Sequence, residues 1–170
     1  MFQTTFKLSQ QELYKGLIAI NRSLFITKLT KGIGILVTLI SLSILFSNLY
    51  AGHYSIFTGG FSLLIGVYLI FGTELIVWRQ SKKLVENNAQ ITETTTYTFD
   101  QTNYQLEGES FSTRLDYAKL HEVRETKEFI LFRVSQGLAH VVPRRALSIE
   151  QLAGLKGILA AIPGLKLEFR

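Results

Sequence analysis

Two long apolar runs dominate the pattern of hydrophobic and polar positions. Gly32–Tyr50 carries no charged residue, and Ser55–Trp78 carries one, Glu74, near its C-terminal end. A helix needs about 20 apolar residues to cross about 30 Å of hydrocarbon. Only residues 51–54 separate the two runs. The pattern therefore predicts a transmembrane helical hairpin with spans at about 32–50 and 55–78.

The pattern before the first run predicts a short strand and an amphipathic helix. Phe2, Thr4 and Phe6 alternate with polar residues, which is the period of a half-buried strand. Ser9 and Glu12 then have the spacing of a helix capping box. The apolar positions that follow at helical spacing are Leu13, Leu17, Ile20 and Leu24. The helix is expected to lie in the headgroup plane, to extend the first span or to pack on the soluble domain.

After the second run, the period changes from helical to that of strands. Residues 80–90 are polar and predict a linker that takes in the end of the second helix. Short alternating segments then predict strands at 91–99, 104–106, 111–117, 120–125, 129–134 and 138–142. Ser148 and Gln151 form a second capping-box pattern, which predicts a helix that ends at Pro163-Gly164. Residues 165–169 alternate again and predict an edge strand.

These elements divide the chain into four segments. We expect an N-terminal strand and helix at 1–31, the hairpin at 32–79, a linker at 80–90 and a folded domain at 91–170. The fold class is membrane α+β, with an antiparallel barrel or sheet capped by a C-terminal helix. The strand at 2–8 is on the same side as the domain and could complete its sheet.

The positive charge of the chain flanks the apolar runs. The net charge of +5 divides into +4 over residues 1–31, +2 over 32–83 and −1 over 84–170. Basic residues mark the cytoplasmic side of a span, and Tyr and Trp mark its interfaces. The expected interface anchors are Lys28, Lys31, Tyr50, Tyr54, Trp78, Arg79, Lys82 and Lys83. Both ends of the chain are therefore predicted to be cytoplasmic, in a two-pass protein of the inner membrane.

Two places in the chain carry candidate functional residues. Glu74 is the one ionisable residue inside the apolar runs, which is a default sign of an ion or proton path. It lies close enough to the interface to reach Arg79 or water instead. Arg144 and Arg145 follow Pro143 and could contact a phosphate or a lipid headgroup, since the guanidinium fork matches phosphate oxygens. The alternative is that these arginines pair with acids.

The sequence argues against several other classes of function. The chain has no cysteine, and its three histidines are scattered, so no metal-ligand spacing is present. No nucleotide-binding or nucleophile motif occurs, and we expect neither an enzyme nor a cofactor. The soluble part has no positive excess, which argues against nucleic acid as a partner. Asp116 and Glu122 alternate with apolar neighbours and are expected on solvated strand faces.

The order of strands and the closing helix are those of a pleckstrin-homology-like (PH-like) barrel. Residues 115–147 go further and resemble the YcxB-like family of bacterial membrane proteins. The matching positions are Tyr117, the turn Glu125–Phe129, the strand end Val142–Ala146 and the helix from Ser148. Tyr117 stands where the family pattern has Trp. The resemblance implies a cytoplasmic PH-like domain on a helical hairpin and carries no known activity.

Two functions are expected from this organisation. In the first, the PH-like domain binds a protein or peptide partner, or lipid headgroups, at the membrane surface, for example by adding a strand to a sheet edge. In the second, the hairpin forms a homo-oligomer that acts as a channel or as an accessory subunit of a transporter. The second would use Glu74 and a surface of small residues. That surface comprises Ser41, Ser43, Gly59, Ser62, Gly66 and Gly72.

Overall fold

Two long helices account for the apolar runs. The computed structural model describes residues 1–51, 56–87, 89–135 and 137–169, in two units: Asn21–Arg79, and Met1–Ile20 together with Gln80–Arg170. Helix α2 covers Phe25–Tyr50 and helix α3 covers Ile56–Asn87. Both are long and apolar enough to cross a membrane. Each helix extends beyond its apolar run, because the polar residues next to the run are helical too.

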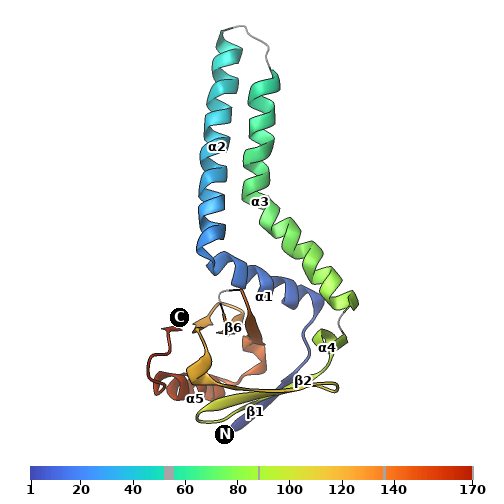
Figure 1. Cartoon of the computed structure of the whole chain (residues 1–170), viewed down its shortest axis with the longest axis vertical. Helices are drawn as coiled ribbons and strands as arrows, with labels where there is room; N and C mark the ends of the chain where they lie inside the picture. The colour runs from blue at the N-terminus through green and yellow to red at the C-terminus, as the bar shows by residue number, and fades with distance from the viewer. Residues whose placement is uncertain (52–55, 88, 136, 170) are drawn as a thin grey trace. The chain divides into compact units, whose positions relative to one another are not determined.

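The two helices of the hairpin lie side by side (Figure 1), and small residues lie between them. A Cβ atom added at Gly66 would lie 2.9 Å from the backbone nitrogen of Thr38, and one at Gly34 would lie 3.1 Å from the carbonyl oxygen of Gly66. Ser41 Oγ donates a hydrogen bond to Ser62 Oγ at 2.9 Å. Ser43 is exposed and takes no part in this contact. Helix packing in lipid uses such small residues because they let two backbones approach.

A four-stranded antiparallel sheet begins with the N-terminal strand. Strand β1 is Phe2–Phe6, and it pairs with β2, Thr95–Phe99, so that Phe2 lies opposite Phe99. Strands β3, Asn103–Glu107, and β4, Ser112–Asp116, complete the order β1-β2-β3-β4. The N-terminal strand therefore does belong to the sheet of the domain. The prediction of a strand from Ile91 was wrong at its start, because a short helix α4, Ala89–Thr92, precedes β2.

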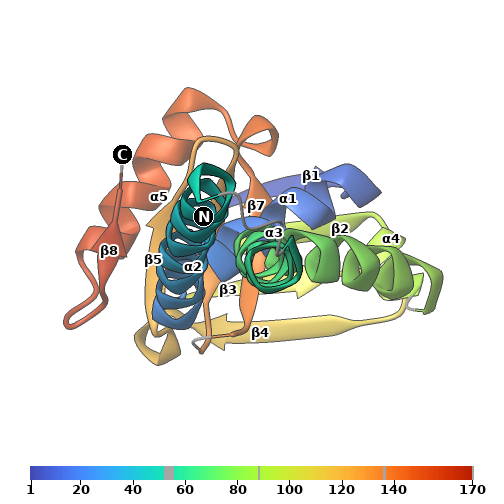
Figure 2. The same ribbon diagram turned by 90° about the horizontal axis from the view of Figure 1, so that it is seen from above.

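The second sheet has the order β7-β6-β5-β8, and Figure 2 shows β8, β5 and β7 in this order from left to right. Its strands are β5, Glu122–Glu125, β6, Phe129–Arg133, β7, Ala139–Pro143, and β8, Leu167–Glu168. Strands β5, β6 and β7 are antiparallel, as expected, whereas β8 pairs with β5 in parallel. Helix α5, Ile149–Ala160, carries the chain from β7 to the far edge of the sheet, so β8 arrives in the same direction as β5.

Aromatic side chains fill the core between the sheets and α5. Tyr104 lies with its ring centroid 4.9 Å from that of Phe132 and 5.7 Å from that of Tyr117. Leu155 and Leu159 of α5 are fully buried against the same cluster. Tyr117 lies in a 3-10 turn, η1, Tyr117–Lys119, rather than in β4. The aromatic residue at this position therefore serves the core.

Helix α1, Gln10–Ser23, packs on the second sheet. The backbone nitrogen of Glu12 donates to Ser9 Oγ, and the backbone nitrogen of Ser9 donates to the Glu12 carboxylate, so the predicted capping box is present. A Cβ atom added at Gly16 would lie 3.0 Å from a methyl group of Val141. Ile20 is buried with Phe129 and Leu131. Of the three arrangements open for this helix, the structure shows packing on the domain.

Candidate functional site

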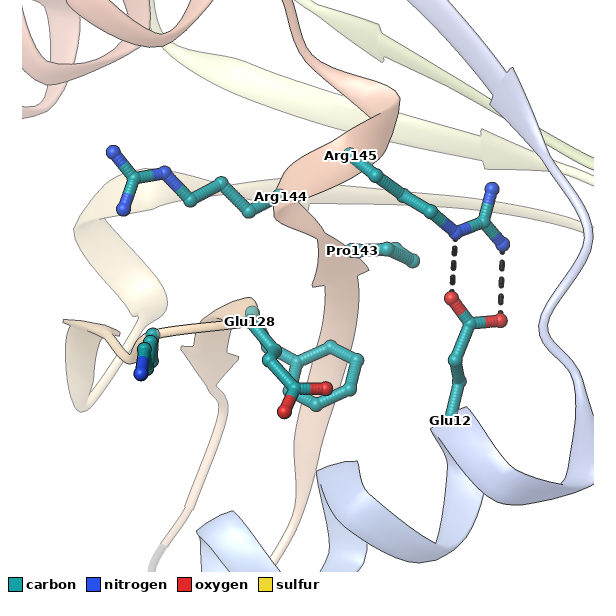
Figure 3. A pocket seen from close by; sticks show the side chains of 7 residues that line it. Glu12, Glu128, Pro143, Arg144 and Arg145 are labelled. Carbon is teal, nitrogen blue, oxygen red and sulfur yellow. Dashed lines mark hydrogen bonds and ion pairs between the residues drawn. The ribbon is translucent and has the colours of Figure 1, made fainter.

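A pocket of about 360 Å³ lies where α1 meets the second sheet (Figure 3). Its lining residues come from three segments: the start of α1, the turn between β5 and β6, and the end of β7 with the 3-10 turn η2, Arg144–Ala146. They are Glu12, Lys127, Glu128, Phe129, Pro143, Arg144 and Arg145. Two of these segments carry the family resemblance, and the pocket lies between them and the N-terminal helix α1.

Backbone and side-chain hydrogen bonds fix the walls of this pocket. Thr126 Oγ1 accepts a hydrogen bond from the backbone nitrogen of Phe129 at 3.0 Å, which closes the tight turn with Lys127 and Glu128 at its tip. The backbone nitrogen of Arg144 donates to the Glu128 carbonyl oxygen at 2.8 Å. These bonds hold the β5–β6 turn beside η2, so the backbone positions of Arg144 and Arg145 both lie next to this turn.

Arg145 is occupied by groups of the N-terminal segment. Its Nε and Nη2 donate to the two oxygens of Glu12 at 2.6 and 2.9 Å, and Nη2 also donates to the Lys7 carbonyl oxygen at 3.1 Å. The hydrogen bonds from Arg145 lower the pKa of Glu12 from 4.5 to about 2. The same carboxylate raises the pKa of Arg145. Glu12 is thus held ionised by a two-pronged charge-assisted contact.

Arg144 points away from Arg145 and is half exposed (Figure 3). Its nearest acid is Glu125, with the guanidinium nitrogen and the carboxylate oxygen 3.7 Å apart. Glu125 is itself 2.6 Å from Lys156 of α5, so that carboxylate already has a closer cation. Lys127 is exposed, and no acid of the described residues forms an ion pair with it. Arg144 and Lys127 are therefore the cations of the lining that have no close acid among the described residues.

The surroundings of the pocket carry an excess of positive charge. Lys15 pairs with Glu128 at 2.7 Å. Glu12 pairs with Arg145, and Glu125 lies near both Arg144 and Lys156. Together these groups comprise five cations and three acids, a local charge of +2. They are Lys15, Lys127, Arg144, Arg145 and Lys156 against Glu12, Glu125 and Glu128. Residues 84–170 sum to −1, so the positive charge is concentrated here.

Glu74 of the hairpin forms an ion pair with α2. Lys31 Nζ lies 2.5 Å from Glu74 Oε1, and an Arg22 nitrogen lies 3.5 Å from the same oxygen. The expected partner was Arg79 or water, and the ion pairs that the structure gives Glu74 are instead with Lys31 and Arg22. Lys31 could have been found from the sequence, because in an antiparallel hairpin the start of the first helix lies beside the end of the second.

The remaining predicted anchors lie at the expected ends of the helices. Tyr50 is exposed at the end of α2, and Trp78, Arg79, Lys82 and Lys83 are exposed on α3. Lys28 is exposed on the first turns of α2, whereas Lys31 pairs with Glu74. Tyr54 lies outside the described residues. The prediction that these side chains anchor the hairpin at membrane interfaces stays a prediction.

Sequence reasoning missed a buried charge cluster in the second sheet. Glu122 was expected on a solvated face, which was wrong: its side chain is 2% exposed, and it accepts hydrogen bonds from Arg124 at 2.8 Å and from Arg133 at 2.9 Å. Burial opposes ionisation of Glu122, but the hydrogen bonds and charges of these arginines outweigh it and lower its pKa. The signal was present in the register, because Glu122 and Arg133 are directly opposite on β5 and β6.

The fold and pocket define a class of protein: two helices apolar enough to span a membrane, joined to an α+β domain of two sheets closed by a C-terminal helix. Residues 99–159 of the chain match the model of a family described as YcxB-like protein. This match runs from the end of β2 into α5 and includes Tyr117, Arg144 and Arg145, so the resemblance to that family is confirmed. Comparison with curated proteins and comparison with solved structures each gave no match.

Proposed function

We propose that this chain is an integral protein of the bacterial inner membrane, in which the α2–α3 hairpin anchors a PH-like domain at the cytoplasmic surface. The domain binds an anionic group, best supplied by a lipid headgroup, in the pocket beside Arg144. The observation that carries the proposal is the exposure of the hairpin. Only 11% and 17% of the most apolar stretches of the two helices are buried in the structure.

The exposed surface of the hairpin supports insertion in lipid. Phe46, Leu49 and Phe71 are 74%, 75% and 62% exposed, and most of their apolar neighbours are open too. A soluble protein rarely leaves so large a continuous apolar surface in contact with water. The basic residues near the start of α2 and the end of α3 favour the cytoplasm for both helix ends, since residues 51–54 contain no Lys or Arg.

The absence of cysteine makes this arrangement easy to test. Single substitutions Tyr50→Cys and Lys119→Cys place one thiol at the end of α2 and one on an exposed turn of the domain. In intact cells, a membrane-impermeant maleimide should label Tyr50→Cys and leave Lys119→Cys unlabelled until the inner membrane is opened. Labelling of Lys119→Cys in intact cells would contradict the proposed orientation. Release of the protein by alkaline carbonate would contradict insertion.

The pocket supports ligand binding because two cations face solvent next to a cavity. Arg144 and Lys127 supply them, within a local charge of +2. Ligand sites are typically clefts of about 300–1,000 Å³ with a few convergent polar groups.

Binding can be measured with the full chain in nanodiscs of neutral lipid. Vesicles that contain phosphatidic acid should bind these nanodiscs, and phosphatidylcholine vesicles should not. The double variant Lys127→Ala/Arg144→Ala should lose binding. Lys119→Ala/Lys166→Ala changes the net charge equally at exposed sites outside the pocket and should keep it. Equal binding by both double variants would contradict a site at the pocket.

A peptide partner is the second candidate, and one observation favours it. Strand β4 is an edge of the first sheet and pairs only with β3 among the described strands. Ser112, Thr113 and Arg114 are all exposed there. An extended peptide adds to such an edge through main-chain hydrogen bonds. Binding of a peptide that survives Lys127→Ala/Arg144→Ala would favour this candidate over the headgroup.

A further inference from the structure

The guanidinium of Arg145 already holds an anion, and that anion belongs to the chain. We propose that Glu12 is an internal competitor for the ligand of the pocket. A phosphate group bound in the pocket takes Arg145 from Glu12 and so frees the first turn of α1 from η2. This inference rests on the proposed function, since it requires that the pocket binds an anion.

The contacts of Arg145 are those of a bound carboxylate ligand. Both oxygens of Glu12 accept from the guanidinium, at 2.6 and 2.9 Å, and the third contact is the Lys7 carbonyl oxygen. Among the described residues, the partners of the Arg145 side chain therefore both come from the segment from Lys7 to Glu12, which includes the start of α1. A guanidinium fork binds carboxylate and phosphate oxygens with the same geometry, so a phosphate can replace Glu12 at this place.

The charge of the pocket favours a phosphate over the carboxylate that it now holds. Glu12 contributes one negative charge, and the surrounding groups still sum to +2 with Glu12 included. A phosphate monoester carries a charge of about −1.5 to −2 at pH 7 and offers three acceptor oxygens. Arg144 and Lys127 lie on the same lining and lack a close acid of their own. A phosphate at Arg145 thus brings more negative charge than Glu12 does to surroundings that have a positive excess.

Displacement of Glu12 leaves α1 in place. Glu12 also accepts from the backbone nitrogen and hydroxyl of Ser9 at 3.0 Å, so it keeps its capping role when Arg145 departs. Gly16 still packs on Val141, and Lys15 still pairs with Glu128. The change is confined to the joint between the first turn of α1 and η2. Ligand binding and the docking of this turn are therefore opposed equilibria.

The test uses full-length protein in nanodiscs of neutral lipid, with Glu12→Gln as the central variant. A capping box accepts Gln in place of Glu, so this variant keeps the helix start and removes the competing charge. Inorganic phosphate, titrated at constant ionic strength with calorimetric detection, should bind Glu12→Gln about 2- to 5-fold more tightly than the unchanged protein. That range corresponds to the loss of one exposed charge pair. Glu109→Gln makes the same charge change in the exposed β3–β4 turn and should bind as the unchanged protein does.

A second readout follows the joint itself. Saturating phosphate should speed amide hydrogen exchange at residues 9–13 of the unchanged protein and leave α5 unaffected. Vesicles containing phosphatidic acid are then used in place of free phosphate to identify the source of the phosphate group. If the vesicles speed exchange at residues 9–13 more than free phosphate does, the group belongs to a lipid. If the two speed exchange equally, the ligand is free phosphate.

The outcomes separate the two claims. If neither the unchanged protein nor Glu12→Gln binds phosphate or phosphatidic acid, the headgroup function fails and this inference fails with it. If both bind with equal affinity, the headgroup function stands and competition by Glu12 is overturned. Tighter binding by Glu109→Gln as well as Glu12→Gln would show a general charge effect and would also overturn it.

Discussion

Two adjacent arginines, at positions 144 and 145, have different partners because η2 turns the chain between them. Arg145 faces α1 and meets Glu12, whereas Arg144 faces the β5–β6 turn and stays half exposed. The sequence presents them as an equivalent pair. The second sheet and α1 together hold Arg145 against Glu12, whereas Arg144 has only the longer contact with Glu125.

The Glu12–Arg145 contact should give the domain a stability that depends on pH. The pKa of Glu12 is lowered from 4.5 to about 2, so the contact is complete above pH 4.5 and is lost as pH falls from 4.5 towards 2. Arg145→Gln should therefore destabilise the domain by about 1 kcal/mol at pH 6, since the pair is partly exposed. The difference should shrink towards zero at pH 2. Thermal unfolding followed by near-ultraviolet circular dichroism of the aromatic core measures it.

The control for this experiment is Lys119→Gln, which removes an exposed pair with Asp116. It should change stability by less than about 0.5 kcal/mol at either pH. A difference between Arg145→Gln and the unchanged protein that is constant from pH 6 to pH 2 would contradict the assigned pairing.

The buried cluster around Glu122 predicts a larger effect. Glu122→Leu removes the carboxylate that faces Arg133 and Arg124 while Arg133 stays 5% exposed. Breaking one partner of a buried ion pair costs about 3–5 kcal/mol. Chemical denaturation should report this loss, and the exposed acid substitution Asp116→Asn should cost less than about 1 kcal/mol. A loss below 1 kcal/mol for Glu122→Leu would show that Arg133 is not committed to this carboxylate.

At the scale of elements, the hairpin depends on a close approach between Gly34 and Gly66. No side chain fits at Gly66, because its Cβ would meet the backbone of Thr38 at 2.9 Å. Gly66→Leu should therefore separate α2 from α3. A Ser41→Cys/Ser62→Cys pair reports the separation: the two serine oxygens are 2.9 Å apart, and the chain has no other cysteine. The disulfide should form readily in the Ser41→Cys/Ser62→Cys protein. When Gly66→Leu is added, the yield of disulfide should be much lower.

Gly32→Leu is the matched control for the hairpin, since a Cβ at Gly32 meets nothing within 4 Å. The disulfide should form in that background as it does in the parent. Equal crosslinking with Gly66→Leu would mean that the two helices pack through another face.

Periodicity predicted most elements, and the failures have physical causes. The two capping boxes gave the starts of α1 and α5 correctly, because a cap is a local interaction between residues three apart. The direction of β8 was not predictable from its own residues, since it depends on the path of α5 across the sheet. The burial of Glu122 was missed because alternation places a residue on a face without saying what covers that face.

At the scale of the whole molecule, the folded domain is discontinuous in sequence. It consists of Met1–Ile20 and Gln80–Arg170, and the hairpin is inserted between them. Residues 88–170 alone lack β1 and α1. They should fail to fold, because β2 loses β1, one of its two partners, and Phe129, Leu131 and Val141 lose the cover of Ile20. Dispersion of amide signals in a nuclear magnetic resonance spectrum checks this.

A chain that contains both segments of the domain is the control for this prediction. Joining residues 1–20 to residues 80–170 through a flexible Gly/Ser linker should give a folded domain without the hairpin. A well-dispersed spectrum for residues 88–170 alone would show instead that the N-terminal strand and helix are dispensable.

The pairing of Phe2 with Phe99 also sets an order of events during synthesis. The first strand leaves the ribosome 97 residues before its partner; at about 5–20 residues per second, this is a delay of roughly 5–20 s. Throughout that interval its apolar face has no sheet to join, while the two apolar helices are being synthesised. The nascent N-terminus therefore needs protection, by the growing helix α1 or by a chaperone, until the C-terminal half emerges.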